Sequence, residues 1–278
     1  MILDGRLTAS YIRAQVADEV RRIEQEITLA IIMVGNNMAS QTYVKNKIKA
    51  CEEVGITVRD YFLDENISQK EVLDIINKCN KDETVTGVLV QLPLPKHLEE
   101  KVIVDAIHPN KDVDGLTITN QGALMMNEDG IIPATPKGVI TLLKRYYVEI
   151  TGKNVVVVGR SNLVGKPLAL LFLNENATVT IAHSKTPNLK EITKKADIVV
   201  AAAGKAKLIT ADMVKRDAVV VDVGTNRVEG KLCGDVDFEE VQDVASYISP
   251  VPGGCGPMTI ASLLENIIKC YKKQNNII

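Results

Sequence analysis

Residues 154–167 read Asn154-Val-Val-Val-Val-Gly159-Arg-Ser-Asn-Leu-Val-Gly165-Lys-Pro167. Four consecutive valines that end at a glycine indicate a strand buried on both faces, because β-branched side chains suit a pleated sheet and no polar residue alternates with them. The residues after the glycine predict a tight turn and the start of a helix. At such a junction the N–H groups of the first helical turn can bind a pyrophosphate.

Three more runs rich in β-branched residues follow, separated by helical stretches. Together with the first, they occupy residues 154–159, 177–183, 197–203 and 218–222. Strands that alternate with helices form a parallel sheet covered on both faces. With a helix at 136–147 leading into them, these runs predict a Rossmann-like, doubly wound nucleotide-binding domain over residues 136–250.

The first part of the chain alternates in the same way, so we predict an α/β fold with two domains. Helices are expected at 8–25, 40–54, 68–80 and 98–107, and strands at 29–35, 58–63 and 86–91. Residues 1–117 form the other domain, completed by a helix at 258–273 that packs back on it. Pro, Asn, Asp and Gly break the rhythm over 108–135, and we assign residues 118–135 and 251–257 to interdomain loops.

The charge balance is close to neutral, with 33 Lys and Arg against 35 Asp and Glu. Binding to nucleic acid or to anionic membranes needs an excess of positive charge, so neither partner is expected. Hydrophobic residues at 46% and charged residues at 24% are typical of a folded, soluble protein. No apolar run approaches the ~20 residues of a membrane-spanning helix.

Cysteine and histidine give no sign of a metal site. The five cysteines are scattered and never form C-x-x-C, so neither a disulfide framework nor a zinc site is indicated. Buried thiols in a reducing compartment explain them best, and we expect a cytoplasmic protein. The three histidines form no H-E-x-x-H motif, which argues against a metal-dependent hydrolase.

The turn after the four valines fits the known phosphate-binding motifs only in part. Against G-x-G-x-x-G, the second glycine is Ser161 and the third is Val164, followed by Gly165. A Walker A loop is excluded, because five residues instead of four precede Gly165 and Pro167 replaces the hydroxyl residue. Taken alone, the turn could be an ordinary connection in a doubly wound sheet.

The end of the next strand indicates which dinucleotide binds. An NAD-specific domain places Asp or Glu about 20 residues beyond the glycine turn, but the chain reads Ala182-His-Ser-Lys-Thr186 there. Arg160, Ser184 and Lys185 offer donors and positive charge for a 2′-phosphate. We therefore expect NADP rather than NAD, although Lys185 could also be a solvated loop lysine.

Four polar residues of the first domain could form a site. Tyr43 and Lys47 are four apart on a predicted helix and share one face, as many surface pairs do by chance. Gln91 ends an apolar strand at the carboxyl edge of the sheet, where ligands bind, or it could bond to the following turn. Asp114, like Asp112, could be a simple turn former before a glycine.

Longer motifs run in order along the whole chain. They are Ala39-Ser-Gln-Thr-Tyr-Val-Lys-Asn-Lys47, Ala50-Cys-Glu-Glu-Val-Gly55, Gly87-Val-Leu-Val-Gln-Leu-Pro-Leu-Pro95, His108-Pro-Asn-Lys-Asp-Val-Asp-Gly115, Thr135-Pro-Lys-Gly138, Gly159-Arg-Ser161, Pro250-Val-Pro-Gly-Gly254 and Gly256-Pro-Met-Thr259. By these motifs the sequence closely resembles the bifunctional methylenetetrahydrofolate dehydrogenase/methenyltetrahydrofolate cyclohydrolase family. The resemblance implies a homodimer whose NADP-dependent oxidation of 5,10-methylenetetrahydrofolate is followed by hydrolysis to 10-formyltetrahydrofolate.

The resemblance also implies roles for individual residues, with a folate cleft between the domains 1–117 plus 258–278 and 136–250. Lys47 would be the catalytic lysine, oriented by Gln91, with Tyr43 stacked on the folate and Asp114 holding the pterin. The other residues implied at the substrate site are Leu92, Pro252, Gly253 and Gly254, and those at the cofactor site are Gly159, Arg160, Ser161, Val164, Ser184, Thr225 and Thr135. The sequence departs from the family's usual residues at Leu116, Thr117, Ala134, Thr225 and Cys255.

Three alternatives stay open on the sequence alone. A dehydrogenase-only member of the family would lack the function of Lys47. A shikimate- or amino-acid-type dehydrogenase would share the two-domain plan but is not expected to carry Gln91-Leu-Pro-Leu-Pro95. A non-enzymatic NADP-sensing or scaffold protein could share the fold, because a fold alone does not fix activity.

Overall fold

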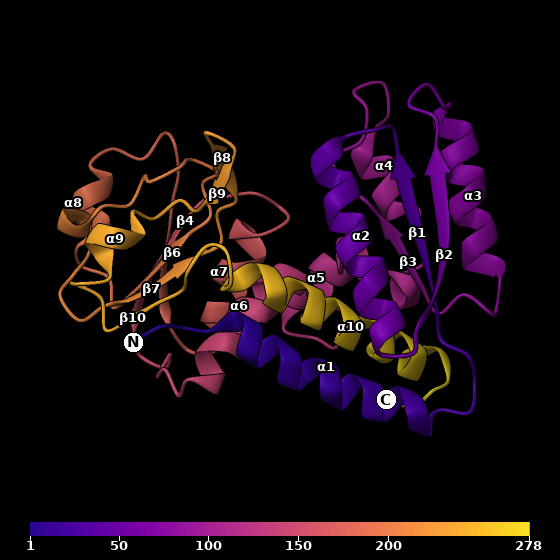
Figure 1. The fold of residues 1–278 in the computed structure, drawn as a ribbon, viewed down its shortest axis with the longest axis horizontal. Coiled ribbons are helices and arrows are strands. Elements are labelled where there is room, and N and C mark those ends of the chain that lie inside the picture. Colours follow the sequence, from indigo (N-terminus) through magenta and orange to yellow (C-terminus); the bar gives the residue numbers. More distant parts are fainter. Residues whose placement is uncertain (278) are drawn as a thin grey trace. The chain divides into compact units, whose positions relative to one another are not determined.

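The computed structural model describes residues 1–277, which divide into two compact units (Figure 1). Among the described residues, the glycine-loop unit comprises residues 1–10 and 135–262, and the Lys47 unit comprises residues 11–134 and 263–277. Helices α1 (Gly5–Arg22) and α10 (Cys255–Gln274) each contribute residues to both units. No helix within residues 1–277 is long and apolar enough to cross a membrane.

The glycine-loop unit contains the predicted parallel sheet, in the strand order β10-β7-β6-β4-β5. Its strands are β4 (Asn154–Val158), β5 (Thr178–Ala182), β6 (Ile198–Ala201), β7 (Val219–Asp222) and β10 (Tyr247–Ile248). The neighbours of β4 are β5 on one side and β6 on the other, so the chain changes direction across the sheet there. This switch point puts the turn after β4 at the edge where ligands bind in doubly wound sheets.

The core of this unit consists of the valines and alanines of the central strands. Val156, Val158, Val199 and Val220 are at most 4% exposed. The helices of this unit are α6 (Ala134–Arg145), α7 (Gly165–Asn174), α8 (Leu189–Thr193) and α9 (Phe238–Val241), with a 3-10 turn η2 (Ala211–Met213). A hairpin of β8 (Asn226–Val228) and β9 (Lys231–Cys233) follows β7, and neither it nor β10 was predicted, because these strands have only two or three residues.

Residues 1–10 pack in the glycine-loop unit, whereas the sequence grouped them with residues 11–117. The N–H of Leu3 donates to Ile248 O at 2.8 Å, beside the edge strand β10. The first turn of α1 also lies against the turn at 251–254, because a Cβ atom on Gly5 would lie 1.8 Å from Gly254 O. These contacts attach the start of the chain to this unit.

The Lys47 unit is built on a three-stranded parallel sheet in the order β2-β1-β3. The strands are β1 (Thr28–Val34), β2 (Thr57–Leu63) and β3 (Gly87–Val90), and the middle strand β1 is buried throughout. The helices are α2 (Met38–Glu53), α3 (Gln69–Lys81), α4 (Glu100–Asp105) and α5 (Ile118–Met126), with a 3-10 turn η1 (Pro109–Lys111). In both units the predicted strands lie within a few residues of their expected positions.

The assignment of 118–135 to a loop was wrong. Helix α5 lies there, beginning after Thr117, whose hydroxyl accepts the N–H of Asn120, and ending at Asn127 in the left-handed conformation (φ 55°). With nine residues and a glycine, it is too short to show a clear apolar period. Helix α6 likewise begins inside the predicted loop, at Ala134.

The loop predicted at 251–257 is also shorter than expected. Helix α10 begins at Cys255 rather than at Met258, so Pro257 lies in its first turn. Proline is tolerated there because the N–H groups of the first turn have no partner within the helix.

Candidate active site

Lys47 is a nearly buried cation on α2. Its side chain is 9% exposed, and its Nζ donates a hydrogen bond to Gln91 Oε1 at 3.3 Å. Tyr43, one turn earlier on the same helix, is 43% exposed, and Lys45 faces solvent. The helix is fixed at its start by Asn37, whose side chain accepts a backbone N–H at 3.0 Å. The predicted pair of Tyr43 and Lys47 thus consists of an exposed tyrosine and, one helical turn later, a buried lysine.

Gln91 holds its amide in one orientation. Its backbone N–H donates to Ile32 O at 2.8 Å, which extends the pairing of β1 and β3, and its Nε2 donates to Leu92 O at 2.6 Å. Because the amide nitrogen is engaged, the amide oxygen faces Lys47. Leu92 is half-buried and is joined to Pro93 by a cis peptide bond.

The thiol next to Lys47 stays neutral. Cys51 lies one turn further along α2 and is 0% exposed, and burial raises its pKa to about 12. A thiolate at that place would neutralise the ammonium, but the raised pKa keeps the proton on sulfur at physiological pH. The Lys47 amine therefore faces a neutral thiol along the helix and the amide oxygen dipole of Gln91 at hydrogen-bond distance.

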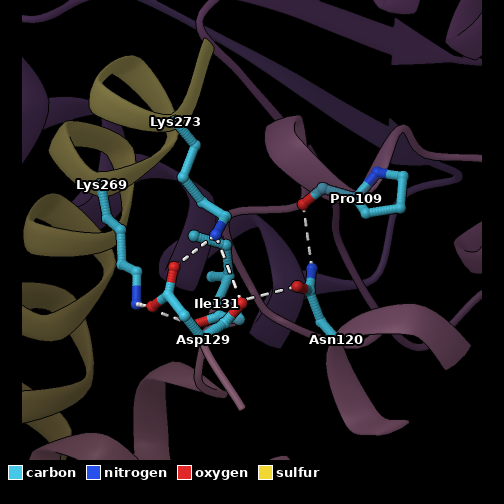
Figure 2. Close-up of polar contacts among 7 residues, drawn as sticks. Pro109, Asn120, Asp129, Ile131, Lys269 and Lys273 are labelled. Atoms are coloured by element: carbon cyan, nitrogen blue, oxygen red, sulfur yellow. Dashed lines mark hydrogen bonds and ion pairs between the residues drawn. The ribbon is translucent and has the colours of Figure 1, made fainter. Parts of the chain in front are cut away.

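Asp114 lies on a turn that is held by buried amides and by Asp112. The Asp112 carboxylate is 1% exposed and accepts hydrogen bonds from Thr117 N at 2.8 Å and Asn120 Nδ2 at 2.9 Å. Burial raises the pKa of Asp112, while these donors act in the opposite direction. Asn120 is itself shared among three segments: its Nδ2 also donates to Pro109 O, and its Oδ1 accepts the N–H of Ile131 (Figure 2).

A second asparagine holds the other side of this turn. Asn266, on α10, donates from Nδ2 to Val113 O at 2.9 Å and to Ile132 O at 2.8 Å. Lys269 and Lys273 of the same helix form ion pairs with Asp129, which fix the segment before Ile132 (Figure 2). Asp114 itself is half-buried, between the anchored Val113 and a glycine.

The turn after β4 leaves no room for side chains at its two glycines. Gly159 has φ +143°, and a Cβ atom on it would lie 2.1 Å from Ala202 O. A Cβ atom on Gly165 would lie 2.3 Å from Gly159 O. The close approach of α7 to β4 therefore requires both glycines, as in phosphate-binding turns.

Ser161 occupies the position of the missing second glycine and caps α7. Its Oγ accepts the N–H groups of Val164 at 3.1 Å and Gly165 at 3.4 Å. Because the oxygen accepts these bonds, its own O–H hydrogen remains available for a phosphate oxygen. Arg160 and Ser161 are both exposed, so the turn presents a guanidinium and a hydroxyl to solvent.

The residues expected at the far end of the dinucleotide follow β5. The N–H of His183 donates to Thr186 Oγ1 at 2.9 Å, and the N–H of Lys185 donates to His183 Nδ1 at 3.2 Å. This closed turn leaves Ser184 and Lys185 exposed. Within residues 182–186 there is no carboxylate to repel a 2′-phosphate.

The remaining predicted residues of this unit lie on three further segments. Thr225 is exposed on the connection between β7 and β8, and Thr135 shares a hydrogen bond of 3.0 Å with Thr259 through their hydroxyls. Gly253 has φ +121°, and its carbonyl accepts the N–H of Arg6 at 3.1 Å. Pro252 is exposed, and Gly254 is buried against the start of α1.

Sequence reasoning missed the two asparagines that hold the Asp114 turn. Asn120 is 3% exposed and Asn266 is 1% exposed. A polar residue among apolar neighbours of a helix is the only signal in the sequence, and it does not say which carbonyls the amide bonds to. The partners of Asn266 are separated from it by more than a hundred residues of chain.

The fold and the two sites define a class of protein. A parallel sheet whose switch point carries a glycine turn is typical of a dinucleotide-binding domain, and the separate α/β unit carries a sheltered lysine oriented by a strand-end glutamine. A two-domain, dinucleotide-dependent dehydrogenase combines these features.

Comparison with known proteins identifies the family. The model of the tetrahydrofolate dehydrogenase/cyclohydrolase catalytic domain matches residues 3–114, and that of the NAD(P)-binding domain of the same family matches residues 133–275. The chain therefore belongs to the tetrahydrofolate dehydrogenase/cyclohydrolase family. This membership excludes a shikimate- or amino-acid-type dehydrogenase.

Individual relatives agree over nearly the whole chain. The bifunctional protein FolD of Campylobacter concisus is 55% identical over 271 residues, covering 96% of each chain. The crystal structure of the bifunctional FolD methylenetetrahydrofolate dehydrogenase/cyclohydrolase from Campylobacter jejuni is 49% identical and superimposes with a TM-score of 0.97 over 99% of each chain. The enzyme from Trypanosoma brucei, described as complexed with NADP cofactor and an inhibitor, is 37% identical with a TM-score of 0.94, covering 99% of this chain and 98% of that one.

Proposed function

We propose that this protein oxidises 5,10-methylenetetrahydrofolate with NADP and hydrolyses the resulting 5,10-methenyltetrahydrofolate to 10-formyltetrahydrofolate. The observation that carries this proposal is the bond of Lys47 Nζ to Gln91 Oε1, one helical turn from the exposed ring of Tyr43. Family membership supports both activities, and the relative from Trypanosoma brucei, whose structure contains NADP, supports the choice of cofactor.

The residues of the glycine-loop unit suit a dinucleotide with a 2′-phosphate. NADP supplies the hydride acceptor when bound. Gly159 and Gly165 would let the backbone approach its pyrophosphate, and the Ser161 hydroxyl would donate to a phosphate oxygen. Ser184 and Lys185 would bind the 2′-phosphate. We assign Arg160, Val164, Thr225 and Thr135 to the same site. For hydride transfer these residues would need only to hold the planar nicotinamide ring of the cofactor in place.

Hydrolysis requires a proton to move, and Lys47 is the residue we assign to it. In its neutral form, which the cationic methenyl ring favours by like-charge repulsion, Lys47 accepts a proton from the attacking water. As the carbonyl forms and the bond from the carbon to N5 breaks, N5 is protonated, and one proton is released overall. Gln91 keeps the amine in place throughout.

The other assigned residues of the substrate site bind and orient the folate. Tyr43 stacks on the aromatic part of the folate. The chain has only seven Tyr, three Phe and no Trp, so few other rings could take this role. Asp114 accepts hydrogen bonds from the pterin, on a turn held from both sides by buried amides. We also assign Leu92, Pro252, Gly253 and Gly254 to the folate site, on the motifs in which they occur.

Assembly and location follow from the family resemblance and from the cysteines. We propose a homodimer because the family resemblance implies one, and sedimentation velocity tests it directly. We propose a cytoplasmic protein because none of the five cysteines, all of which lie in the described residues 1–277, forms a disulfide.

A coupled assay tests the proposed function. Purified protein is given 5,10-methylenetetrahydrofolate with NADP or with NAD, and absorbance of the methenyl product is followed as it rises and then decays. We expect turnover with NADP at a higher kcat/KM than with NAD, followed by hydrolysis. No turnover with either cofactor would refute the proposal, and accumulation of methenyltetrahydrofolate without accelerated decay would leave a dehydrogenase-only enzyme.

A further inference from the structure

Two buried carboxylates lie at the carboxyl edge of the five-stranded sheet. Asp222, the last residue of β7, is 3% exposed. Its Oδ1 accepts the N–H groups of Gly224 and Asp235, both at 2.9 Å, and its Oδ2 accepts the N–H of Val236 at 2.9 Å. Asp222 therefore joins the turn after β7 to the segment that follows the β8–β9 hairpin.

Asp235 extends this connection to a third segment. Its carboxylate is 0% exposed, and its Oδ2 accepts the N–H groups of Ala203 at 2.6 Å and Gly204 at 2.8 Å, just beyond β6. Its Oδ1 accepts Asn226 Nδ2 at 2.9 Å, at the start of the hairpin. The two ends of one carboxylate thus hold the segments that follow β6 and β7.

The two aspartate side chains are tightly packed against neighbouring glycines. A Cβ atom on Gly224 would lie 2.2 Å from Asp235 Cγ, and a Cβ atom on Gly234 would lie 1.8 Å from Asp222 Oδ2. Each carboxylate is therefore packed against the backbone that precedes or follows the other. Each of the two carboxylates accepts three hydrogen bonds, so each connects separate segments of the backbone.

The segments that Asp235 holds are those that the dinucleotide needs. Ala202, adjacent to the bonded Ala203, places its carbonyl oxygen 2.1 Å from where a Cβ atom on Gly159 would lie, so this backbone forms the wall behind the glycine turn. Thr225 lies between Gly224, bonded to Asp222, and Asn226, bonded to Asp235. A displacement of Asp235 would therefore shift both the backbone at Ala202 and Ala203 and the turn at Thr225.

We propose that Asp235, anchored by Asp222, is a positioning residue for NADP: it holds the backbone after β6 and the Thr225 turn in the arrangement that binds the dinucleotide. The inference rests on the proposed function, because it takes the glycine turn as the NADP site. Asp235 acts without contacting the cofactor, since a buried carboxylate would repel the phosphates and its oxygens already accept three bonds.

The substitution Asp235→Asn tests this role with little change in volume. One carboxylate oxygen becomes an NH₂ group that faces hydrogen-bond donors. The protein therefore loses either the bonds to the backbone after β6 or the bond to Asn226. We expect the KM for NADP and the dissociation constant of NADP, measured by calorimetry, to rise roughly ten-fold. Hydrolysis of methenyltetrahydrofolate without NADP should stay within about two-fold of wild type, because Lys47 and Gln91 lie in the other unit.

A carboxylate at the opposite edge of the same sheet provides the matched control. Asp197 accepts the N–H of Asn154 at 2.9 Å and pairs with Lys215, just before β6. Asp197→Asn makes the same chemical change at the amino edge and should leave the affinity for NADP unchanged. A second variant, Asn226→Ala, removes the bond that the half-buried Asn226 donates to Asp235 and leaves the carboxylate in place. It should raise the KM for NADP by a smaller factor than Asp235→Asn does.

The outcomes separate the two proposals. An unchanged dissociation constant of NADP in both Asp235→Asn and Asn226→Ala would overturn the positioning role, as would a parallel loss of NADP-independent hydrolysis in Asn226→Ala. Failure of the wild type to turn over methylenetetrahydrofolate would refute the proposed function instead. NADP binding by calorimetry would still test Asp235 in that case.

Discussion

The two candidate sites of this chain are built from different materials. In the Lys47 unit the proposed chemistry depends on side chains that contact each other directly, with Lys47 Nζ bonded to Gln91 Oε1 at 3.3 Å. In the glycine-loop unit the site is mostly backbone, brought close by Gly159 and Gly165 and held by carboxylates that lie behind it. A side-chain site fails when a functional group is removed, whereas a backbone site fails when an atom is added.

This difference predicts that single substitutions can separate hydrolysis from cofactor binding, each substitution impairing one and sparing the other. Removing an amine should stop hydrolysis and spare cofactor binding. Adding one methyl group at the glycine turn should weaken cofactor binding and spare hydrolysis. Lys47→Met and Gly159→Ala test that separation.

Lys47→Met should have the largest effect. Methionine fills the same sheltered space but cannot carry a proton, so methenyltetrahydrofolate hydrolysis should fall by roughly a thousand-fold, within the range for loss of a general acid–base group. Stopped assays on methenyltetrahydrofolate measure this loss, and calorimetry should show unchanged NADP affinity. The matched control is Lys45→Met, an exposed lysine on the same helix, which should retain full activity. Normal hydrolysis by the Lys47 variant would remove the amine from the mechanism.

Gly159→Ala should reverse that pattern. The added Cβ atom would lie 2.1 Å from Ala202 O at φ +143°, so the turn must move and NADP affinity should fall by roughly a hundred-fold. Calorimetry with NADP measures the loss, and cyclohydrolase activity should persist. Gly152→Ala is the control, because Gly152 also has a positive φ (+73°) but no atom within 4 Å of an added Cβ. Equal losses in both variants would attribute the effect to backbone strain rather than to the turn.

The same difference decides what the sequence reveals. The buried strands, the glycine turn and the Tyr43 to Lys47 spacing are local patterns, and the structure contains each of them close to its predicted place. Helix α5 was missed because its nine residues are stabilised by Asp112 and by the cap at Thr117 rather than by their own periodicity. Partners such as Val113 for Asn266 depend on the tertiary fold, which no spacing rule contains.

Asn120→Ala tests whether the Lys47 unit also depends on buried backbone contacts. The substitution leaves the Asp112 carboxylate short of one donor and the N–H of Ile131 without its acceptor, in a buried setting. We expect a loss of about 3 kcal/mol in unfolding free energy, measured by urea titration. Asn66→Ala, at an exposed asparagine, should cost well under about 1 kcal/mol. A raised KM for folate in the folded Asn120 variant would extend the effect to the Asp114 turn.

The titration of Asp222 provides a smaller, pH-dependent test in the glycine-loop unit. Burial raises its pKa from 3.8 to about 6, so the protonated form is favoured in the folded protein relative to the unfolded chain. Its contribution to stability is present below about pH 4 and is lost as the pH rises through about 6. Between about pH 4.5 and 6 the unfolding free energy of the wild type should fall by about 2 kcal/mol relative to Asp222→Asn. Parallel stability curves for the two proteins would show that Asp222 has an ordinary pKa.

Thiol labelling gives the smallest expected effect, a change in mass at one side chain, and it compares the two units in one experiment. Burial raises the pKa of Cys51 in the Lys47 unit and of Cys255 in the glycine-loop unit to about 12 each, so neither forms the thiolate that iodoacetamide attacks. Cys233, half-buried on β9, is the cysteine that solvent reaches, so mass spectrometry of the native protein should show one modification, absent in Cys233→Ser. Modification of Cys51 under native conditions would mean that α2 opens around Lys47. In that case the amine of Lys47 would also be open to solvent.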